Sequence, residues 1–254
     1  MKRTITIATR DFKSLVTSPI FLFLAGMMTI VLSFVFLRNL LQFMEHSAIS
    51  AAQFGGGPNI YMIVFAQHIS LTNLIFVFVI PALTMRLLAE EKKVRTYDLL
   101  LTSPVTATDI ALGKYIGALM AAGLLTFISM LYPLGMLMVS EYNLSMVLSG
   151  YAGLFLVTGI YVAVGLFGSS LTESVLLSVV IGVIFNLVLW FVSQGKDFFS
   201  SAKWVTVMEH VSLVQHFGNF MRGSPKISSL VFLLSCIGFF VFLTQRVVES
   251  SRWR

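Results

Sequence analysis

Charge is the scarcest feature of this 254-residue sequence, because only 11% of it is Asp, Glu, Lys or Arg. A soluble domain carries about 25% charged residues, and so large a shortfall leaves too little polar surface to cover a globule in water. Hydrophobic residues make up 57% of the chain, and the mean hydropathy is +0.91. These proportions exclude an ordinary soluble enzyme and favour a protein that lies in a lipid bilayer.

Cysteine and catalytic motifs are scarce as well. The one cysteine, Cys236, lies in an apolar run, which excludes an internal disulfide and gives no metal-ligand spacing. The sequence has no His-Glu-x-x-His zinc motif, no Gly-x-Ser-x-Gly elbow and no phosphate-binding loop. Residues 1–17 are polar and amphipathic, so we expect no cleavable signal peptide. We therefore predict that the chain is not an enzyme and binds no metal or cofactor itself.

The apolar residues gather in runs close to the roughly 20 residues of helix that cross a hydrocarbon core. We predict an all-α membrane protein with six transmembrane helices, at residues 20–37, 69–85, 116–139, 146–171, 175–192 and 227–244. Residues 61–66 could extend the second helix outward.

The segment before the first span has a different pattern. Its apolar residues share one helical face, whereas Arg10 and Lys13 fall on the other, and Pro19 then ends the segment. This pattern is typical of a helix in the membrane interface. We expect one transmembrane domain over 1–254, made of an interfacial helix at 1–19, a six-helix domain at 20–245 and a cytoplasmic tail at 246–254.

Most of the 17 Lys and Arg residues flank the spans on the side that carries both termini. The positive-inside rule then places both termini in the cytoplasm, and membrane topology explains the net charge of +6 better than nucleic-acid binding does. Two outer segments, 38–60 and 195–226, are large enough to contact a periplasmic partner. The sequence thus predicts a multi-pass protein surrounded by membrane lipids, with no nucleic-acid partner.

Titratable groups are missing from the predicted mid-membrane region. All Asp, Glu, Lys and Arg residues fall in loops or at span ends by this assignment. Ion-coupled carriers usually keep such groups at mid-depth. The absence argues against a stand-alone channel or secondary carrier, and a membrane-embedded enzyme is the least favoured alternative.

The longest predicted cytoplasmic loop, 86–114, is the most informative segment. A cluster of charges at 90–95 precedes an amphipathic stretch at 96–101, which Ser103-Pro104 ends. Thr106 and Asp109 have the spacing of a capping box, with Asp in place of Glu, and are expected to start the third helix. Apolar side chains facing water at this surface indicate either a docked protein partner or a loop held by lipid head groups.

This loop resembles the ABC-2 family of exporter permeases. The resemblance rests on Glu90-Glu91-Lys92, on Asp98-Leu99-Leu100-Leu101-Thr102-Ser103-Pro104 and on Asp109-Ile110-Ala111-Leu112-Gly113-Lys114, in that order. The family often has Gly-Thr-x-Glu before the leucines, whereas this chain has Arg95-Thr96-Tyr97-Asp98. Residues 214–223 and 249–254 are most similar to gliding-motility-associated permeases, and copper-enzyme-maturation permeases share the same layout.

The resemblance implies a permease subunit in the bacterial inner membrane. Two such chains, identical or related, would pair, and two cytoplasmic ATPase subunits holding ATP and Mg would push on a coupling helix between spans two and three. The implied coupling residues are Glu90, Glu91, Arg95, Thr96, Tyr97, Asp98, Leu99, Leu100, Leu101, Thr102, Ser103, Pro104, Asp109 and Glu173. A scaffold that transmits force to an envelope machine without moving a solute remains an alternative.

Two smaller patterns leave alternatives open. Gly113, Gly117 and Ala121 form a small-residue stripe that favours close helix packing, within one chain or between chains. Glu209, His210 and His216 could suit a metal, but an interfacial helix with polar residues facing water fits them better. His68 is expected to hydrogen-bond locally.

Overall fold

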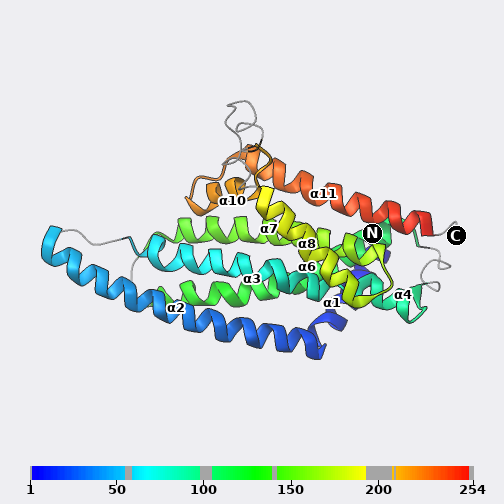
Figure 1. Cartoon of the computed structure of the whole chain (residues 1–254), viewed down its shortest axis with the longest axis horizontal. Coiled ribbons are helices and arrows are strands. Elements are labelled where there is room, and N and C mark those ends of the chain that lie inside the picture. Colours follow the sequence, from blue (N-terminus) through cyan, green and yellow to red (C-terminus); the bar gives the residue numbers. More distant parts are fainter. Residues whose placement is uncertain are drawn as a thin grey trace.

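Every regular element in the described part of the chain is a helix. The structure is a computed structural model, and it describes residues 2–54, 59–97, 105–138, 142–192, 208 and 210–251. Six helical runs there are long and apolar enough to cross a membrane, which confirms the predicted six-span, all-α architecture. They pack side by side into an elongated bundle (Figure 1).

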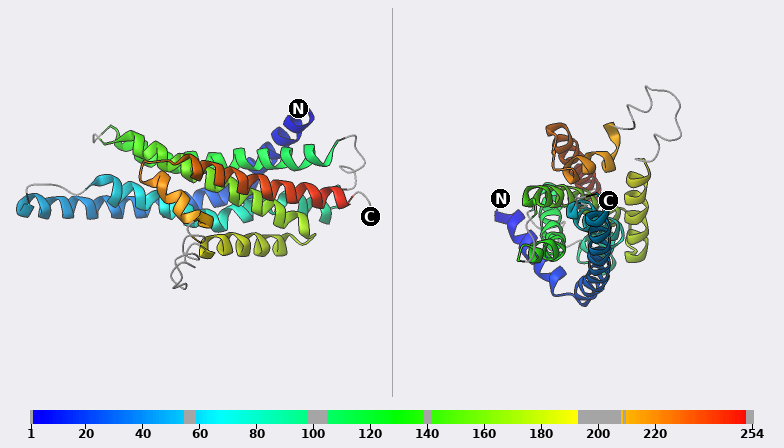
Figure 2. Two further views of the ribbon diagram at one scale, coloured as in Figure 1. Left: turned by 90° about the horizontal axis from the view of Figure 1, so that it is seen from above. Right: turned by 90° about the vertical axis from the view of Figure 1, so that its left-hand side faces the viewer.

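The first half of the chain starts with α1 (Lys2–Val16), which packs across the end of the bundle that carries the C-terminus (Figure 2). The elements after it are α2 (Pro19–Phe54), the π-helix η1 (Tyr61–Phe65), α3 (Ala66–Thr84), the π-helix η2 (Arg86–Glu90), α4 (Glu91–Lys93) and α6 (Ala107–Met136). The second half contains α7 (Leu144–Leu171), α8 (Val175–Val192), α10 (Leu213–Met221) and α11 (Ile227–Ser250).

Three helices run beyond the spans that the sequence predicts. The first helix does not end at Leu37 but continues to Phe54, so most of the expected outer segment 38–60 is helical, and residues 55–58 lie outside the described part. The second run extends over Tyr61–Lys93, including the optional extension. The last helix runs to Ser250 through half of the predicted tail. Charged residues inside these extensions obscured the helix ends, because a hydropathy criterion stops where charge appears.

The core lies around α7, which contacts α3, α6, α8, α10 and α11. In its most apolar window 78% of residues are buried inside the chain, against 17% for α2 and for α8. Small residues on α7 let its neighbours pack closely against it. At Gly153, for example, an added Cβ atom would lie only 2.5 Å from the Cβ of Phe220 on α10. The peripheral helices α2 and α8 therefore present broad apolar faces outward.

Candidate functional site

The first turn of α6 is built by a capping box. The Thr106 hydroxyl accepts a hydrogen bond from the Asp109 amide at 3.1 Å, and the Asp109 carboxylate accepts from the Thr106 amide, as the sequence predicts. The other carboxylate oxygen of Asp109 accepts a hydrogen bond from the Thr4 hydroxyl at 2.7 Å. Asp109 therefore both starts α6 and attaches α1 to it.

The predicted small-residue stripe of α6 lies under α1. A Cβ on Gly113 would come within 2.8 Å of the Ile7 Cβ, and a Cβ on Gly117 within 2.8 Å of the Ala8 carbonyl oxygen. Ala121, one turn beyond Gly117, is fully buried. Of the two packing alternatives, the structure thus shows contact within the chain for both glycines, and neither position has room for a larger residue.

Lys114 is the best-buried charge of the described residues, with a side chain only 1% exposed. Its ammonium nitrogen lies 2.8 Å from Glu91 Oε1 and 3.3 Å from Asp11 Oδ2, and it donates to the Leu87 carbonyl at 2.6 Å. These partners come from α1, η2 and the start of α4, which meet around α6. A buried ammonium requires such compensation, because desolvation of an unpaired charge costs several kcal/mol.

Arg10 closes this ion network from the outside. Its guanidinium lies 2.8 Å from Asp11 and 3.2 Å from Glu91. Partial burial by itself lowers the pKa of Arg10, but the charges of the two carboxylates and their hydrogen bonds outweigh it and raise the pKa above its usual value. We call Arg10, Asp11, Glu91 and Lys114 the charge clasp, since its two cations and two anions join three segments.

The π-helix η2 depends on a serine of α7. A π segment shifts the backbone hydrogen-bond register, so some amides need other partners. Ser169 Oγ accepts from the Leu88 and Ala89 amides at 3.2 and 2.9 Å and donates to the Met85 carbonyl at 3.0 Å. The η2 segment is thereby held against α7, while the clasp holds it against α6.

Helix α4 ends at Lys93, and Arg95, two residues later, is the only described residue besides Gly223 with a positive φ. The Arg95 amide donates to the Lys92 carbonyl at 3.1 Å and the Thr96 amide to the Glu91 carbonyl at 3.0 Å, which is the hydrogen-bond pattern of a Schellman motif. Such a position favours glycine. The glycine that the resembled family often has at this position would adopt such a backbone conformation without strain, whereas this chain has Arg95 there.

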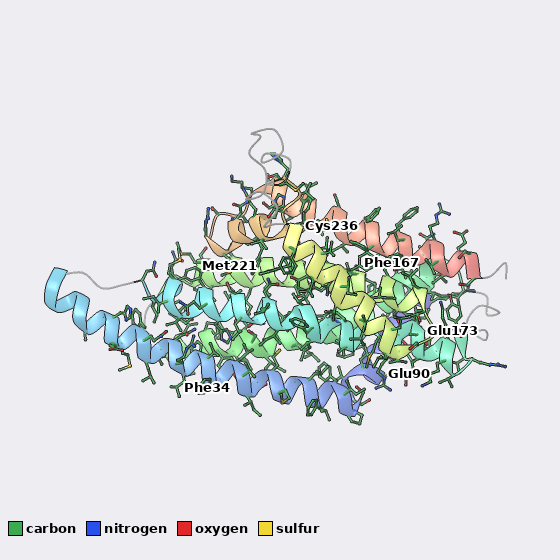
Figure 3. The ribbon with its side chains drawn as sticks, viewed as in Figure 1. Phe34, Glu90, Phe167, Glu173, Met221 and Cys236 are labelled. Carbon is green, nitrogen blue, oxygen red and sulfur yellow. The ribbon has the colours of Figure 1, made fainter. Side chains whose placement is uncertain are left out.

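Two cavities open at this end of the bundle. One, of about 330 Å³, is lined by the charge clasp together with Arg86, Glu90 and Thr96. The other, of about 790 Å³, lies between α4 and the N-terminal end of α8. Its charged lining residues are Lys92, Lys93, Arg95 and Glu173. Figure 3 shows Glu90 and Glu173 at the same end of the bundle.

Several predicted coupling residues therefore lie together. Glu90 pairs with Arg86 at 2.6 Å, Glu91 belongs to the charge clasp, and Tyr97 is buried, with the Lys92 ammonium 5.3 Å from the centre of its ring. The motif residues Asp98, Leu99, Leu100, Leu101, Thr102, Ser103 and Pro104 lie outside the described residues. The structure thus describes the residues on both sides of segment 98–104.

Sequence reasoning missed the roles of Arg10, Asp11 and Ser169, which only tertiary contacts reveal. It also misplaced two histidines. His68 does not bond locally but lies 3.1 Å from both Ser129 oxygens on α6. His216 does not face water: it is buried, with Nδ1 3.0 Å from Ser229 Oγ and Nε2 2.9 Å from the His210 carbonyl.

Six helices able to span a membrane and an amphipathic helix bound to their bundle define a multi-pass membrane protein. The family model of the ABC-2 family transporter proteins matches residues 5–252. The chain therefore belongs to the ABC-2 transporter family and is a transmembrane permease subunit, a component without an ATP site of its own. A search of the curated proteins finds no match to this chain.

Proposed function

We propose that this chain couples ATP hydrolysis by a separate ATPase to export, or to other work in the envelope, across a bacterial inner membrane. The end with α1, α4 and the C-terminus faces the cytoplasm, since Lys and Arg concentrate there. Two ATPase subunits, which bind ATP and Mg, dock beneath a pair of permease chains. The similarity of residues 214–223 to gliding-motility permeases favours work in the envelope.

The charge clasp is the observation that carries this proposal. The proposed coupling segment, residues 96–104, connects η2 and α4 to α6 along the chain. A force applied to it is therefore expected to reach these helices. Lys114 joins α6 to η2 and α4 directly through the Leu87 carbonyl and Glu91, and Asp11 adds α1 to the same contact. A push on the segment is therefore expected to move α1, α3 and α6 together, rather than bending the loop alone.

The second cavity supplies a contact of suitable chemistry. Its three cationic side chains suit an acidic patch on the ATPase, and Glu173 at the turn between α7 and α8 adds a place for one basic group. Leu99, Leu100 and Leu101 are the proposed apolar contacts with the ATPase. Mixed charge around an apolar centre is the usual anatomy of a specific interface.

The test is copurification in mild detergent from native membranes. We expect an ATPase subunit to accompany the wild-type chain and to be lost from Leu100→Asp. The matched control is Met138→Asp, the same kind of change at the opposite end, where the side chain is 93% exposed. Absence of any ATPase from the wild-type sample, or equal loss from both variants, would contradict the proposal. Substrate-stimulated ATPase activity in liposomes would separate export from pure force transmission.

A further inference from the structure

His68 on α3 is a buried imidazole with one ring nitrogen bonded and the other not. The residue is 0% exposed, and its Nε2 lies 3.1 Å from both the carbonyl oxygen and Oγ of Ser129. Its Nδ1 has no hydrogen-bond partner among the described residues. An ionisable side chain inside a membrane span indicates a function, because burying such a group in the bilayer is costly.

The hydrogen bonds around Ser129 decide which ring nitrogen carries the proton. The Thr72 hydroxyl donates to the His68 carbonyl at 2.8 Å, and the Tyr151 hydroxyl donates to the Ser129 carbonyl at 2.8 Å. The Ser129 hydroxyl therefore donates to Thr72 Oγ1, 2.9 Å away, because the Thr72 proton is already used. With all three hydroxyl protons assigned, His68 has to donate to Ser129 from Nε2, and neutral His68 leaves Nδ1 as a bare acceptor.

The surroundings of the ring offer nothing to a second proton. Phe36 of α2 packs edge-on against it, with ring centres 5.3 Å apart, and Tyr132 of α6 lies tilted against it at 5.1 Å. The titratable side chains that face it are Tyr132 and Tyr151, and Tyr132 donates to a carbonyl of α2 at 3.0 Å. No charged side chain of the described residues pairs with the ring. Arg38, two residues beyond Phe36, is exposed and donates to the next residue of its own helix.

These bonds join three spans at one depth. His68 on α3, Ser129 on α6 and Tyr151 on α7 each lie about two helical turns from the end of their span that is opposite to the C-terminus (Figure 1). His68 and Tyr151 bond to the same carbonyl group of Ser129. We call His68, Thr72, Ser129 and Tyr151 the outer cluster, since the proposed orientation places this end outside the cytoplasm.

His216, the other buried histidine of the described residues, differs in the bonding of its ring. Its Nδ1 lies 3.0 Å from Ser229 Oγ, and its Nε2 lies 2.9 Å from the His210 carbonyl oxygen. A second proton would keep both partners, because a hydroxyl oxygen can accept as well as donate. The nitrogen without a partner is therefore a property of His68 and not of buried imidazoles in general.

We propose that His68 is a proton-sensitive switch, which holds the outer ends of α3, α6 and α7 together when neutral and releases them when it takes up a proton from the outer side. The inference goes beyond the proposed function and takes from it only the orientation of the chain. A proton on Nδ1 creates a donor without an acceptor and a charge without a counter-ion inside the outer cluster. Proton uptake is therefore coupled to separation of the three helices, which lets water reach the ring.

The test is thiol labelling of the purified full chain in lipid nanodiscs. In the Cys236→Ser chain, Val147→Cys places a thiol at a buried position of α7, one turn from Tyr151 on its outer side. Met138→Cys, at a 93% exposed position, corrects for the pH dependence of the labelling reaction itself. We expect the ratio of the two rates to rise at least about fivefold between about pH 8 and about pH 5, the range in which imidazoles change charge.

Two histidine variants assign that rise. His68→Gln keeps an amide that can donate to Ser129 but takes up no proton, so we expect a flat ratio. His216→Gln is the matched control, because it removes the other buried imidazole of this end, and we expect it to keep the rise. A flat ratio in the parent chain, or a rise that depends on His216 and persists in His68→Gln, would overturn the proposal.

Ser129→Ala tests the outer cluster without altering the histidine. It removes the hydroxyl that joins α6 to α3 but keeps the carbonyl, so we expect faster labelling at Val147→Cys already at about pH 8, where the imidazole is neutral. An unchanged rate would contradict the role of the cluster in closing this end. The purified chain is measured without an ATPase, so the outcome is separate from that of the copurification test.

Discussion

Removing the Lys114 ammonium is the sharpest test of how this bundle is held together. Lys114→Met keeps a long apolar side chain in place but removes the positive charge. Two carboxylates, on Asp11 and Glu91, then lose their common partner, and the Leu87 carbonyl loses its donor. Only Arg10 remains, and its side chain is 56% exposed.

The magnitude follows from burial. Breaking a buried ion pair by removing one partner typically costs about 3–5 kcal/mol, and the Asp11 side chain is only 8% exposed. Glu91 is 22% exposed, and Arg10 still neutralises part of the charge, so we expect the lower end, about 3 kcal/mol. For a chain of this length that lowers the thermal midpoint by roughly 6–12 °C.

The assay is thermal unfolding in one detergent for wild type, Lys114→Met, Asp11→Asn and the double variant. Because the two side chains interact directly, we expect the double variant to be less destabilised than the sum of the single variants, by about 1–3 kcal/mol. Added salt is expected to change the effect little, since buried pairs are poorly screened. A loss below about 0.5 kcal/mol in Lys114→Met, or strict additivity, would refute the argument.

Three further predictions concern the same end of the bundle. Gly117→Ala is expected to lower the free energy of unfolding by about 1–3 kcal/mol, because the added methyl group meets the backbone of α1. The control Gly135→Ala, with nothing within 4 Å, is expected to be neutral or stabilising. Thermal midpoints check both variants. Arg95→Gly is expected to stabilise the chain by about 1 kcal/mol by relieving a left-handed backbone, and an unchanged or lower midpoint would contradict this. Ser169→Ala is expected to cost about 1–3 kcal/mol by leaving amides of η2 without acceptors, which faster hydrogen exchange there would report. Ser170→Ala, which loses a bond within its own helix turn, is the milder control.

Composition and periodicity determined the architecture. Runs of apolar residues near the length of a bilayer crossing predicted six spans, and the fourth and fifth were placed closely, because turns mark their ends. The capping box at Thr106 and Asp109 could also be predicted, since a cap depends on residues only three apart. The family motif was readable for the same reason: it is a local pattern.

Only the tertiary structure decided what the charges and small residues do. Lys114 reads in sequence as a surface lysine near a span end, yet it is buried because Asp11 and Glu91, from distant segments, meet it there. The glycine stripe could have faced either its own chain or another one, and the fold brings α1 onto it. Sequence separation hides such contacts, because charge pairing and close packing depend on distances in space, whereas helix formation and bilayer crossing depend on neighbours along the chain.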